Sequence, residues 1–527
     1  MASAPKYVLA IDLGTSGPKV ALFSTRGELI DNDFEPTGLQ LLPDGGAEQS
    51  PEEWWQAIST AVQRMLARGR VPLEQIAAIG TTGQWAGTVA LDQQGNALGN
   101  AIIWFDSRGE PFTHRVMDGP IKVSGYSLPK MLKWIDRTAG IPSPSGKDSI
   151  GHMLYIKHKL PEIYQKTYKF LEPIDYIGFR LTGCMAASYD SVTLYWMTDN
   201  RNINDVRYDD ELIRIAGLDR SKLPDLKRAD AVLGTLLPDV ARAWGLQPDV
   251  KIIMGSPDTH SAAVGAGAVR DYECHAYIGT SSWLVCQIPG KKTDAATGQA
   301  ALPSAIPGKY VLVDSQECAG ICMQFLRDNV LFCDDGLSIG PQPENIYPIF
   351  DQIAARAPAG SGKLIFAPWL YGERAPVEDR YARGIFFNLS LQTTRADLIR
   401  GMYEGIAYNT RWLLATAEPF LKRHVESINM VGGGARSEIW CQIHADVLNR
   451  TIRQMAEPIH ANTRGAALLA SAALGYVRYD EIPECVPVAR TLTPNPANRA
   501  LYDELFEQFL ALYKTNRKAF ARLNAIR

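Results

Sequence analysis

Two short patterns of Gly, Thr and Ser are the residues of this sequence best suited to hold phosphate. They are Asp12-Leu13-Gly14-Thr15-Ser16 and Ile278-Gly279-Thr280-Ser281, and their glycines stand 265 residues apart (279 − 14). In such a turn the backbone N–H groups and hydroxyls point into one concavity, which suits phosphate oxygens. Each pattern lies between two apolar runs, which predicts two β-hairpins. Two such turns on one chain indicate a duplicated fold that binds a polyphosphate from both sides.

Asp258 is the candidate proton acceptor. The apolar run Lys251–Met254 predicts a strand, Gly255-Ser256-Pro257 breaks it, and the small apolar run Ala262–Val269 predicts a tightly packed helix. A carboxylate just beyond the carboxyl end of a strand lies where α/β folds bind ligands, and it could take a proton from a substrate hydroxyl. The alternative is an aspartate that caps the helix N-terminus. Position alone favours neither interpretation.

Asp12 and Lys19 flank the first turn and are candidates for the charges of a phosphate site. Phosphoryl transfer needs Mg²⁺ to neutralise the polyphosphate, and Mg²⁺ prefers one or two carboxylates together with waters and phosphates. We therefore expect Asp12 and Asp258 to hold Mg²⁺ through water, and Lys19 to reach a phosphate. The alternatives are that Asp12 caps the hairpin turn and that Lys19 is a solvated strand residue.

Three further segments suit the rest of a nucleotide and a polyhydroxylated ligand. Gly432-Gly433-Gly434-Ala435-Arg436-Ser437 joins a strand to a helix, so that adenine could approach the bare backbone; otherwise this is a flexible turn in which Ser437 caps the helix. Gln84-Trp85 and Trp104-Phe105-Asp106-Ser107-Arg108 set aromatic rings beside amide, carboxylate and guanidinium groups. Sugars use such hydrogen bonds and stack their C–H faces on rings, although Trp104 alone is more typical of a core.

Strands and helices alternate along the whole chain, which predicts an α/β protein with covered sheets. With 527 residues, two domains are expected, and we place them at residues 1–250 and 251–527. The clearest periodic segments predict the following elements: strands Tyr7–Ile11, Lys19–Ser24, Glu28–Phe34, Ile76–Thr81 and Ser427–Val431, and helices Pro51–Arg68, Leu154–Leu160, Arg395–Leu421, Ser437–Leu448, Arg464–Leu474 and Asn498–Leu523.

The bulk composition excludes several classes of protein. The chain is 46% hydrophobic and 21% charged, as in folded globular proteins, and its net charge of −3 argues against a nucleic-acid partner. The apolar stretches are too short to span a membrane and the N-terminal residues do not read as a signal peptide, so we expect a cytoplasmic protein. The eight cysteines show no metal-binding spacing, and we expect buried reduced thiols.

Taken together, these landmarks resemble the FGGY carbohydrate kinases, most closely the xylulokinase-like branch. The resemblance covers nearly the whole chain, through Ile11 to Gly17 with Lys19, Ile278 to Ser282, Val431 to Ser437 with Trp440, Tyr371 to Pro376, and Ala382 to Leu389. It implies two actin-like, ribonuclease-H-like domains with ATP in the cleft between them. It also implies that Asp258 is the general base and that Gly320 lies at the nucleotide site.

The departures from the family pattern fall on the sugar side. Where xylulokinases usually carry Gly-Gln-Met-His-Gly, this chain has Gly83-Gln84-Trp85-Ala86-Gly87, and Thr259 follows the base where they have Asn or Gln. The Trp-Asn-Asp-x-Arg pattern becomes Trp104 to Arg108, and the N-terminal signature is blurred at Gly151 to Tyr155. The loss of one hydrogen-bonding partner in a buried polar site can shift specificity by orders of magnitude. The reaction type is therefore better defined than the substrate.

The sequence thus predicts an ATP-dependent carbohydrate kinase that uses Mg²⁺. Asp258 accepts the proton, and Gln84, Trp85, Asp106, Arg108 and Thr259 contact the sugar. The expected substrate is a ketopentose such as xylulose, and another ketose, a polyol or glycerol is the alternative. A non-catalytic sugar or nucleotide sensor and a chaperone-type ATPase are the alternatives of another class. A homodimer is compatible with the sequence.

Overall fold

The computed structural model describes residues 5–123, 125–294, 297–333, 335 and 341–525. The first half of the chain forms a mixed sheet of seven strands, in which β18 (Ser256–Pro257) also pairs with β6. In spatial order its other strands are β16 (Val232–Thr235), β17 (Lys251–Ile253), β6 (Ile76–Gly83), β1 (Tyr7–Gly14), β2 (Gly17–Ser24) and β3 (Leu29–Phe34). β1 and β2 are antiparallel, and β6 runs parallel to β1.

The second half forms a sheet of eight strands. In spatial order they are β21 (Thr293–Asp294), β22 (Gln299–Pro303), β23 (Tyr310–Gln316), β20 (Ser282–Ile288), β19 (Cys274–Ile278), β26 (Ser427–Val431), β27 (Thr451–Met455) and β28 (Val488–Leu492). Six of these repeat the first sheet in order and direction: β23-β20-β19-β26-β27-β28 corresponds to β3-β2-β1-β6-β17-β16. The predicted duplication is confirmed.

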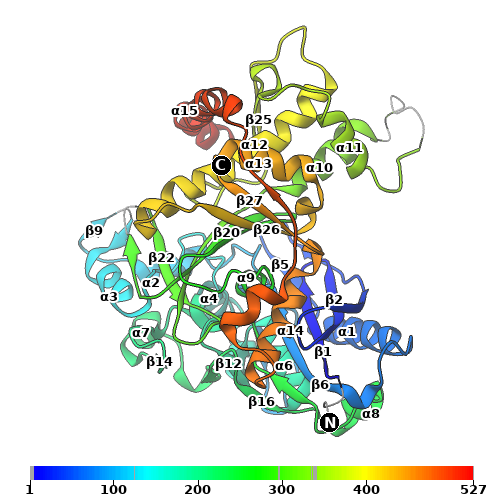
Figure 1. The fold of residues 1–527 in the computed structure, drawn as a ribbon. Coiled ribbons are helices and arrows are strands. Elements are labelled where there is room, and N and C mark those ends of the chain that lie inside the picture. Colours follow the sequence, from blue (N-terminus) through cyan, green and yellow to red (C-terminus); the bar gives the residue numbers. More distant parts are fainter. Residues whose placement is uncertain (1–4, 124, 295–296, 334, 336–340, 526–527) are drawn as a thin grey trace.

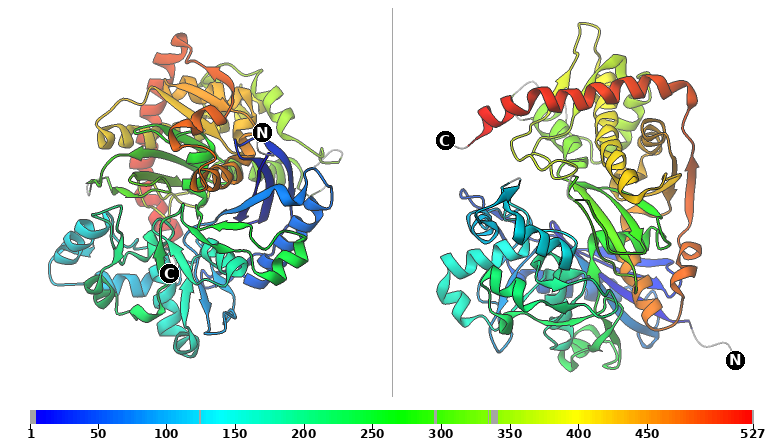
Figure 2. Two further views of the ribbon diagram at one scale, coloured as in Figure 1. Left: turned by 60° about the horizontal axis from the view of Figure 1, so that its bottom comes forward. Right: turned by 90° about the vertical axis from the view of Figure 1, so that its left-hand side faces the viewer.

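Helices cover both sheets (Figures 1 and 2). Those of the first half are α1 (Pro51–Leu66), α2 (Glu110–Met117), α3 (Leu128–Thr138), α4 (Ser149–Lys159), α5 (Pro161–Lys166), α6 (Pro173–Thr182), α7 (Asp210–Ala216), α8 (Pro238–Trp244) and α9 (Asp258–Gly265). Those of the second half are α10 (Gly320–Leu326), α11 (Tyr347–Ala354), α12 (Arg395–Leu421), α13 (Glu438–Leu448), α14 (Ala461–Ala473) and α15 (Arg499–Asn524).

The remaining short strands pair outside the two main sheets. They are β4 (Gln40–Leu41), β5 (Ala47–Gln49), β8 (Ala101–Ile102), β7 (Val89–Leu91), β11 (Lys169–Leu171), β9 (Lys122–Val123), β10 (Tyr126–Ser127), β12 (Ala186–Ser188), β15 (Asp225–Lys227), β13 (Thr198–Asp199), β14 (Arg207–Tyr208), β24 (Ile365–Ala367) and β25 (Ile385–Phe387). Among the described residues, we find no helix with the length and apolar character needed to cross a bilayer.

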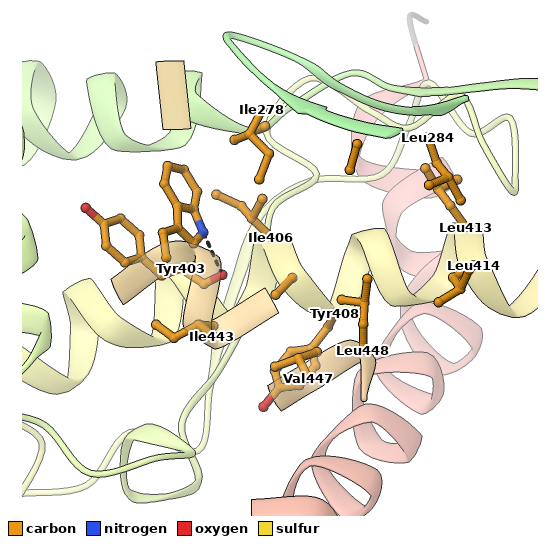
Figure 3. Close-up of a cluster of buried hydrophobic side chains, with 14 of the residues drawn as sticks. Ile278, Leu284, Tyr403, Ile406, Tyr408, Leu413, Leu414, Ile443, Val447 and Leu448 are labelled. Carbon is orange, nitrogen blue, oxygen red and sulfur yellow. Dashed lines mark hydrogen bonds between the residues drawn. The ribbon is translucent and has the colours of Figure 1, made fainter. Parts of the chain in front are cut away.

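Each half has its own hydrophobic core. In the second half, α12 and α13 pack on each other and on the sheet, and Figure 3 shows Tyr403 and Ile406 of α12 between Ile278 of β19 and Ile443 of α13. α12 begins with a capping box, in which the Thr394 side chain accepts from the Asp397 N–H and Asp397 accepts from the Thr394 N–H. That local signal accounts for a helix whose predicted bounds are those observed.

The two halves meet where helix α9 of the first half crosses helix α14 of the second. α9 and α14 cross so closely that a Cβ on Gly265 would lie 1.8 Å from the Ala461 carbonyl oxygen, and one on Gly465 would lie 1.8 Å from the Ser261 carbonyl oxygen. α14 also packs on β1 and β6 of the first sheet. The second half is therefore fastened to the first next to the strands that carry the first hairpin.

One local prediction differs from the structure. The helix expected at Ala262–Val269 is α9, which starts four residues earlier at Asp258, because polar residues occupy its buried first turn. β17 and β18 follow the boundary predicted at residue 250, and both pair with β6 of the first sheet.

The expectation of eight reduced, buried cysteines is wrong for four of them. Cys274 and Cys286 face each other across β19 and β20 and form a disulfide bond. Cys184 is exposed and Cys333 is only partly buried. A cross-strand pair depends on the register of the hairpin, and the spacing of cysteines along the chain does not reveal it.

Candidate active site

A cavity of about 530 Å³ lies between the two halves of the chain. Most of the predicted phosphate and substrate residues line it: Asp12, Gly14, Thr15, Ser16, Lys19, Gln84, Trp85, Asp258, Thr259, Thr280 and Ser281. Two other cavities, of about 320 and 480 Å³, are lined by none of the predicted site residues. The fold thus gathers residues from both ends of the sequence around one space.

The first hairpin brings charge to this cavity. Asp12 and Lys19 are cross-strand neighbours on β1 and β2, with Lys19 Nζ 3.8 Å from Asp12 Oδ2. Asn462 of α14 donates to the same carboxylate at 3.4 Å. Burial raises the pKa of Asp12, although Lys19 and Asn462 act in the opposite direction. At Gly17, where φ is +137°, a Cβ would lie 2.1 Å from the Glu35 carbonyl oxygen, so the turn requires glycine.

The second hairpin offers backbone and hydroxyl groups without a carboxylate. Its turn, Gly279 to Ser281, joins β19 to β20, and Thr280 and Ser281 line the cavity. Gly320 does not line the cavity; its N–H donates to the Gly279 carbonyl at 2.8 Å, and a Cβ there would lie 2.5 Å from that oxygen. The first turn of α10 therefore holds the second hairpin in place.

Asp258 is the first residue of α9 and Pro257 occupies the N-cap position. Its Oδ1 accepts the N–H of Thr259 at 2.7 Å. Burial raises the pKa of Asp258 to about 7, and repulsion from Asp12 adds to the rise. A carboxylate whose pKa lies near neutrality and that borders a cavity has the properties of a general base.

The residues at the cavity suit Mg²⁺. Asp12 and Asp258 are two carboxylates on the wall of one cavity that also contains the phosphate turns. In the described part of the chain, no group of three or more His, Cys, Asp or Glu is arranged to hold a metal by itself. Such a sparse set of oxygen donors fits an ion that keeps waters and phosphate oxygens as its other ligands.

The predicted sugar residues divide into two sets. Gln84 lines the cavity, where its amide donates to Gln49 Oε1 at 2.9 Å and accepts from Thr15 Oγ1 at 3.4 Å. Asp106 and Arg108 do not line the cavity and instead pair with each other, with 2.6 Å between Arg108 Nη2 and Asp106 Oδ2. Asp106 also accepts the N–H of Ala47 at 2.9 Å, so this pair supports the neighbouring loop.

Aromatic rings form much of the cavity wall beside these groups. Trp85, Trp104, Phe105 and Trp283 all line it. Trp104 stacks on Phe105 with ring centroids 3.7 Å apart, and its Nε1 donates to Thr15 Oγ1 at 3.0 Å. Trp104, which alone suggested a core residue, thus links the sugar side of the cavity to the first phosphate turn.

Sequence reasoning gave no role to a charged bridge on the wall of the same cavity. Glu317 lies 3.5 Å from Lys147 Nζ and 3.2 Å from Arg374 Nε, so it joins the first half to the second. Although burial raises the pKa of Glu317, attraction to Arg374 and Lys147 outweighs it and lowers that pKa overall. Arg374 lies in the motif from Tyr371 to Pro376, but the spacing within a motif does not reveal that its ion-pair partner, Glu317, lies 57 residues away in the sequence.

The predicted adenosine segment lies beside the second hairpin. A Cβ on Gly432 or Gly434 would approach Ile278 within 2.6 or 2.5 Å, whereas one on Gly433 would meet nothing within 4 Å. Gly432 to Ala435 does not line the cavity itself. Ser437 caps α13 by accepting the Trp440 N–H at 3.1 Å and donates to Asp351 Oδ1 at 2.7 Å.

Two family models match most of the chain. The N-terminal domain of the FGGY family of carbohydrate kinases matches residues 7–265, and the C-terminal domain of that family matches residues 274–474. Xylulose kinase from Staphylococcus epidermidis is 27% identical over 534 residues, with 99% of each chain covered. Xylulose kinase from Escherichia coli K12 is 28% identical and covers 96% of this chain and 98% of its own.

A solved structure agrees with these sequence relatives. The gluconate kinase from Lactobacillus acidophilus is similar with a TM-score of 0.85 and 25% identity, covering 99% of this chain and 100% of its own. The duplicated sheets and the paired hairpins are thus those of two actin-like domains. The chain belongs to the FGGY family of carbohydrate kinases and is an ATP-dependent sugar kinase.

Proposed function

We propose that this kinase transfers the γ-phosphate of ATP to a hydroxyl of xylulose, and that Asp258 is its general base. The observation that carries the assignment of the base is the carboxylate of Asp258, whose pKa is raised to about 7 and which borders the cavity between the two phosphate hairpins. The xylulose kinases that match along nearly the whole chain support the choice of sugar.

The proposed step is an in-line displacement. Asp258 accepts the proton of the sugar hydroxyl while that oxygen bonds to the γ-phosphorus, and the bond from the γ-phosphorus to the β–γ bridging oxygen breaks to release ADP. Lys19 and the N–H and hydroxyl groups of both turns hold the phosphates. Bound Mg²⁺ would neutralise charge on the polyphosphate, and Asp12 and Asp258 are the residues that would hold it through water.

The identity of the sugar is the more specific part of the proposal. Trp85 and Trp104 offer ring faces to the C–H groups of a sugar, and Gln84 offers an amide. Gluconate is the second candidate, because the solved gluconate kinase shares the fold and gluconokinase from Bacillus subtilis is 26% identical over 509 residues. Another ketose, a polyol or glycerol completes the set to be tested.

A coupled ADP-release assay over xylulose, ribulose, gluconate, erythritol and glycerol separates these candidates. We expect xylulose to give the highest kcat/KM, and a higher value for gluconate would overturn the choice of sugar. ATP hydrolysis that no sugar stimulates would contradict the use of any of them. Product analysis by ³¹P and ¹H NMR then identifies the hydroxyl that carries the phosphate.

We also propose a domain boundary between residues 265 and 274 in place of residue 250. The pairing of β17 and β18 with β6 and the extents of the two family models support it. A need for ATP favours the cytoplasm as the location. Whether the enzyme is a homodimer is a question for size-exclusion chromatography with light scattering.

A further inference from the structure

Tyr277 holds in the second half of the molecule the position that Asp12 holds in the first. Each residue lies two positions before the glycine of its Gly-Thr-Ser turn, and each is on the strand that enters the hairpin. Asp12 faces Lys19 across its hairpin, whereas Tyr277 faces Trp283. The duplication therefore places a phenol where the first copy has a carboxylate.

The phenol of Tyr277 lies against the second phosphate turn. A Cβ built on Gly279 would be 2.4 Å from Tyr277 Cε1 and 3.2 Å from its hydroxyl oxygen, so the ring covers that glycine. Tyr277 also lines the cavity that Asp12, Lys19 and Asp258 line. Its hydroxyl forms no hydrogen bond with any other residue in the described part of the chain.

The ring is held rigidly in this position. Trp283 stacks on it with centroids 4.0 Å apart and an angle of 5° between the planes. The indole is fixed in turn, because Trp283 Nε1 lies 3.1 Å from His275 Nε2 and forms a hydrogen bond with it. A donor that is fixed before the reaction and has no partner in the free protein costs little reorganisation when charge develops beside it.

We propose that the Tyr277 hydroxyl donates a hydrogen bond to an oxygen of the phosphoryl group as it transfers, which makes Tyr277 a catalytic residue of this kinase. The inference rests on the proposed phosphoryl transfer between the two hairpins. The proton of the sugar hydroxyl goes to Asp258, and Tyr277 keeps its own proton throughout. Burial raises the pKa of Tyr277, so the phenol stays protonated and able to donate at neutral pH.

The chemistry of the neighbours favours a phosphoryl oxygen as the acceptor. Three ionisable groups, Lys19, Asp12 and Asp258, act on Tyr277 electrostatically, and they are the groups proposed for phosphate, metal and proton transfer. Residues of both Gly-Thr-Ser turns line the same cavity as this set. A phenol between them would meet the charge that spreads over the equatorial oxygens in the transition state.

The test is the variant Tyr277→Phe, which removes one hydroxyl and keeps the ring that stacks on Trp283. We expect kcat to fall about 10- to 100-fold, the range for losing a hydrogen bond to a charged group. The KM of the sugar should stay within twofold, because the bond is made to the transferring group. The matched control is Tyr513→Phe, which removes a hydroxyl that donates to Asp379 at 3.1 Å and does not line the cavity, and should keep its kcat.

Two results would overturn the proposal: a kcat for Tyr277→Phe within twofold of the wild type, or a rise in the sugar KM with kcat unchanged. The sugar used is the one that the wild-type enzyme phosphorylates fastest, so a wrong choice of substrate does not affect this test. The effect of losing the general base is measured separately, with the variant Asp258→Asn.

A structure of the wild-type enzyme with ADP, aluminium fluoride and that sugar tests the contact without any variant. We expect the Tyr277 oxygen within 3.2 Å of a fluoride that takes the place of an equatorial phosphoryl oxygen. A separation above 4 Å in a complex with both hairpins engaged would contradict the proposal.

Discussion

The two halves of this molecule share a backbone and differ in the side chains that they bring to the cavity. Each has a hairpin with a Gly-Thr-Ser turn, followed in space by a parallel strand, β6 in the first half and β26 in the second. The first hairpin carries Asp12 and Lys19, and the second carries Tyr277 and Trp283. Backbone N–H groups suffice to seat phosphate oxygens on both sides, but charge is concentrated on one.

The loops that follow β6 and β26 differ in the same way. Gln84 and Trp85 follow β6, whereas Gly432 to Gly434 follow β26. An amide beside an indole ring suits a sugar, and bare backbone suits a flat base. We therefore propose that each half binds one substrate, with the phosphates at the seam between the halves. Asp258 begins α9 at this seam, and the predictions below test that division of labour from the largest effect to the smallest.

The largest effect is expected for Asp258→Asn. Loss of the proton acceptor should lower kcat by about 10²- to 10⁴-fold, the range for general-base catalysis, while ATP still binds. The control is Asp314→Asn, since Asp314 is another carboxyl whose pKa burial raises to about 7, but it accepts from Gln299 and does not line the cavity. Steady-state kinetics and ATP titration measure both. Equal losses in the two variants would show that burial of a carboxylate, and not its position at the seam, is what matters.

Much of this division could be predicted from the sequence, and the limits have physical causes. The Gly-Thr-Ser turns could be predicted because small residues between two apolar runs suit phosphate oxygens, whereas the position of Asp258 suited a helix cap equally well and only the family resemblance favoured a general base. Tyr277 was missed, although an alignment of the two hairpins extended two residues before the glycine would have placed it beside Asp12. Asp106 and Arg108 pair with each other outside the cavity, and the sequence could not show this because the choice of partner is a property of the folded chain.

The symmetry of the helix crossing is tested by Gly265→Ala and Gly465→Ala. Each new Cβ would lie 1.8 Å from a carbonyl oxygen of the other helix, so each variant should lose about 3 kcal/mol of stability or more. Gly290→Ala is the control, because a Cβ there meets nothing within 4 Å. Denaturant unfolding measures all three. A large loss for one helix alone would mean that the crossing is not shared equally between the halves.

The pH dependence of kcat/KM tests whether the negative charge of Asp12 raises the pKa of Asp258. With a pKa near 7, raised by burial and by Asp12, the base is protonated at lower pH, so kcat/KM should fall about tenfold per unit below pH 7. Asp12→Asn should move that break to lower pH, because it removes the repelling charge. A break that stays in place in Asp12→Asn would contradict the coupling.

The same pKa has a consequence for stability. Between its ordinary value of 3.8 and about 7, the folded carboxyl of Asp258 binds protons that the unfolded chain has released, so folding loses stability as pH rises through this window. Asp258→Asn removes the effect, whose upper bound is ~4 kcal/mol. Without ligands, the variant should therefore gain more in Tm over the wild type at pH 8 than at pH 5. An equal gain at both values would show that the carboxyl is not strained by burial.

The smallest effect is expected in the loop Gly432 to Gly434, where we separate a glycine needed for packing from a glycine that leaves room for the nucleotide. A Cβ on Gly434 would lie 2.5 Å from Ile278 Cγ2, whereas a Cβ on Gly433 meets open space. Gly434→Ala should lower the Tm, since Ile278 is buried in the core of that half. Gly433→Ala should leave the Tm within about a degree. It should raise the KM of ATP about two- to fivefold, because the added methyl group would crowd the adenine ring. If Gly433→Ala instead changes the KM of the sugar, the assignment of one substrate to each half is wrong.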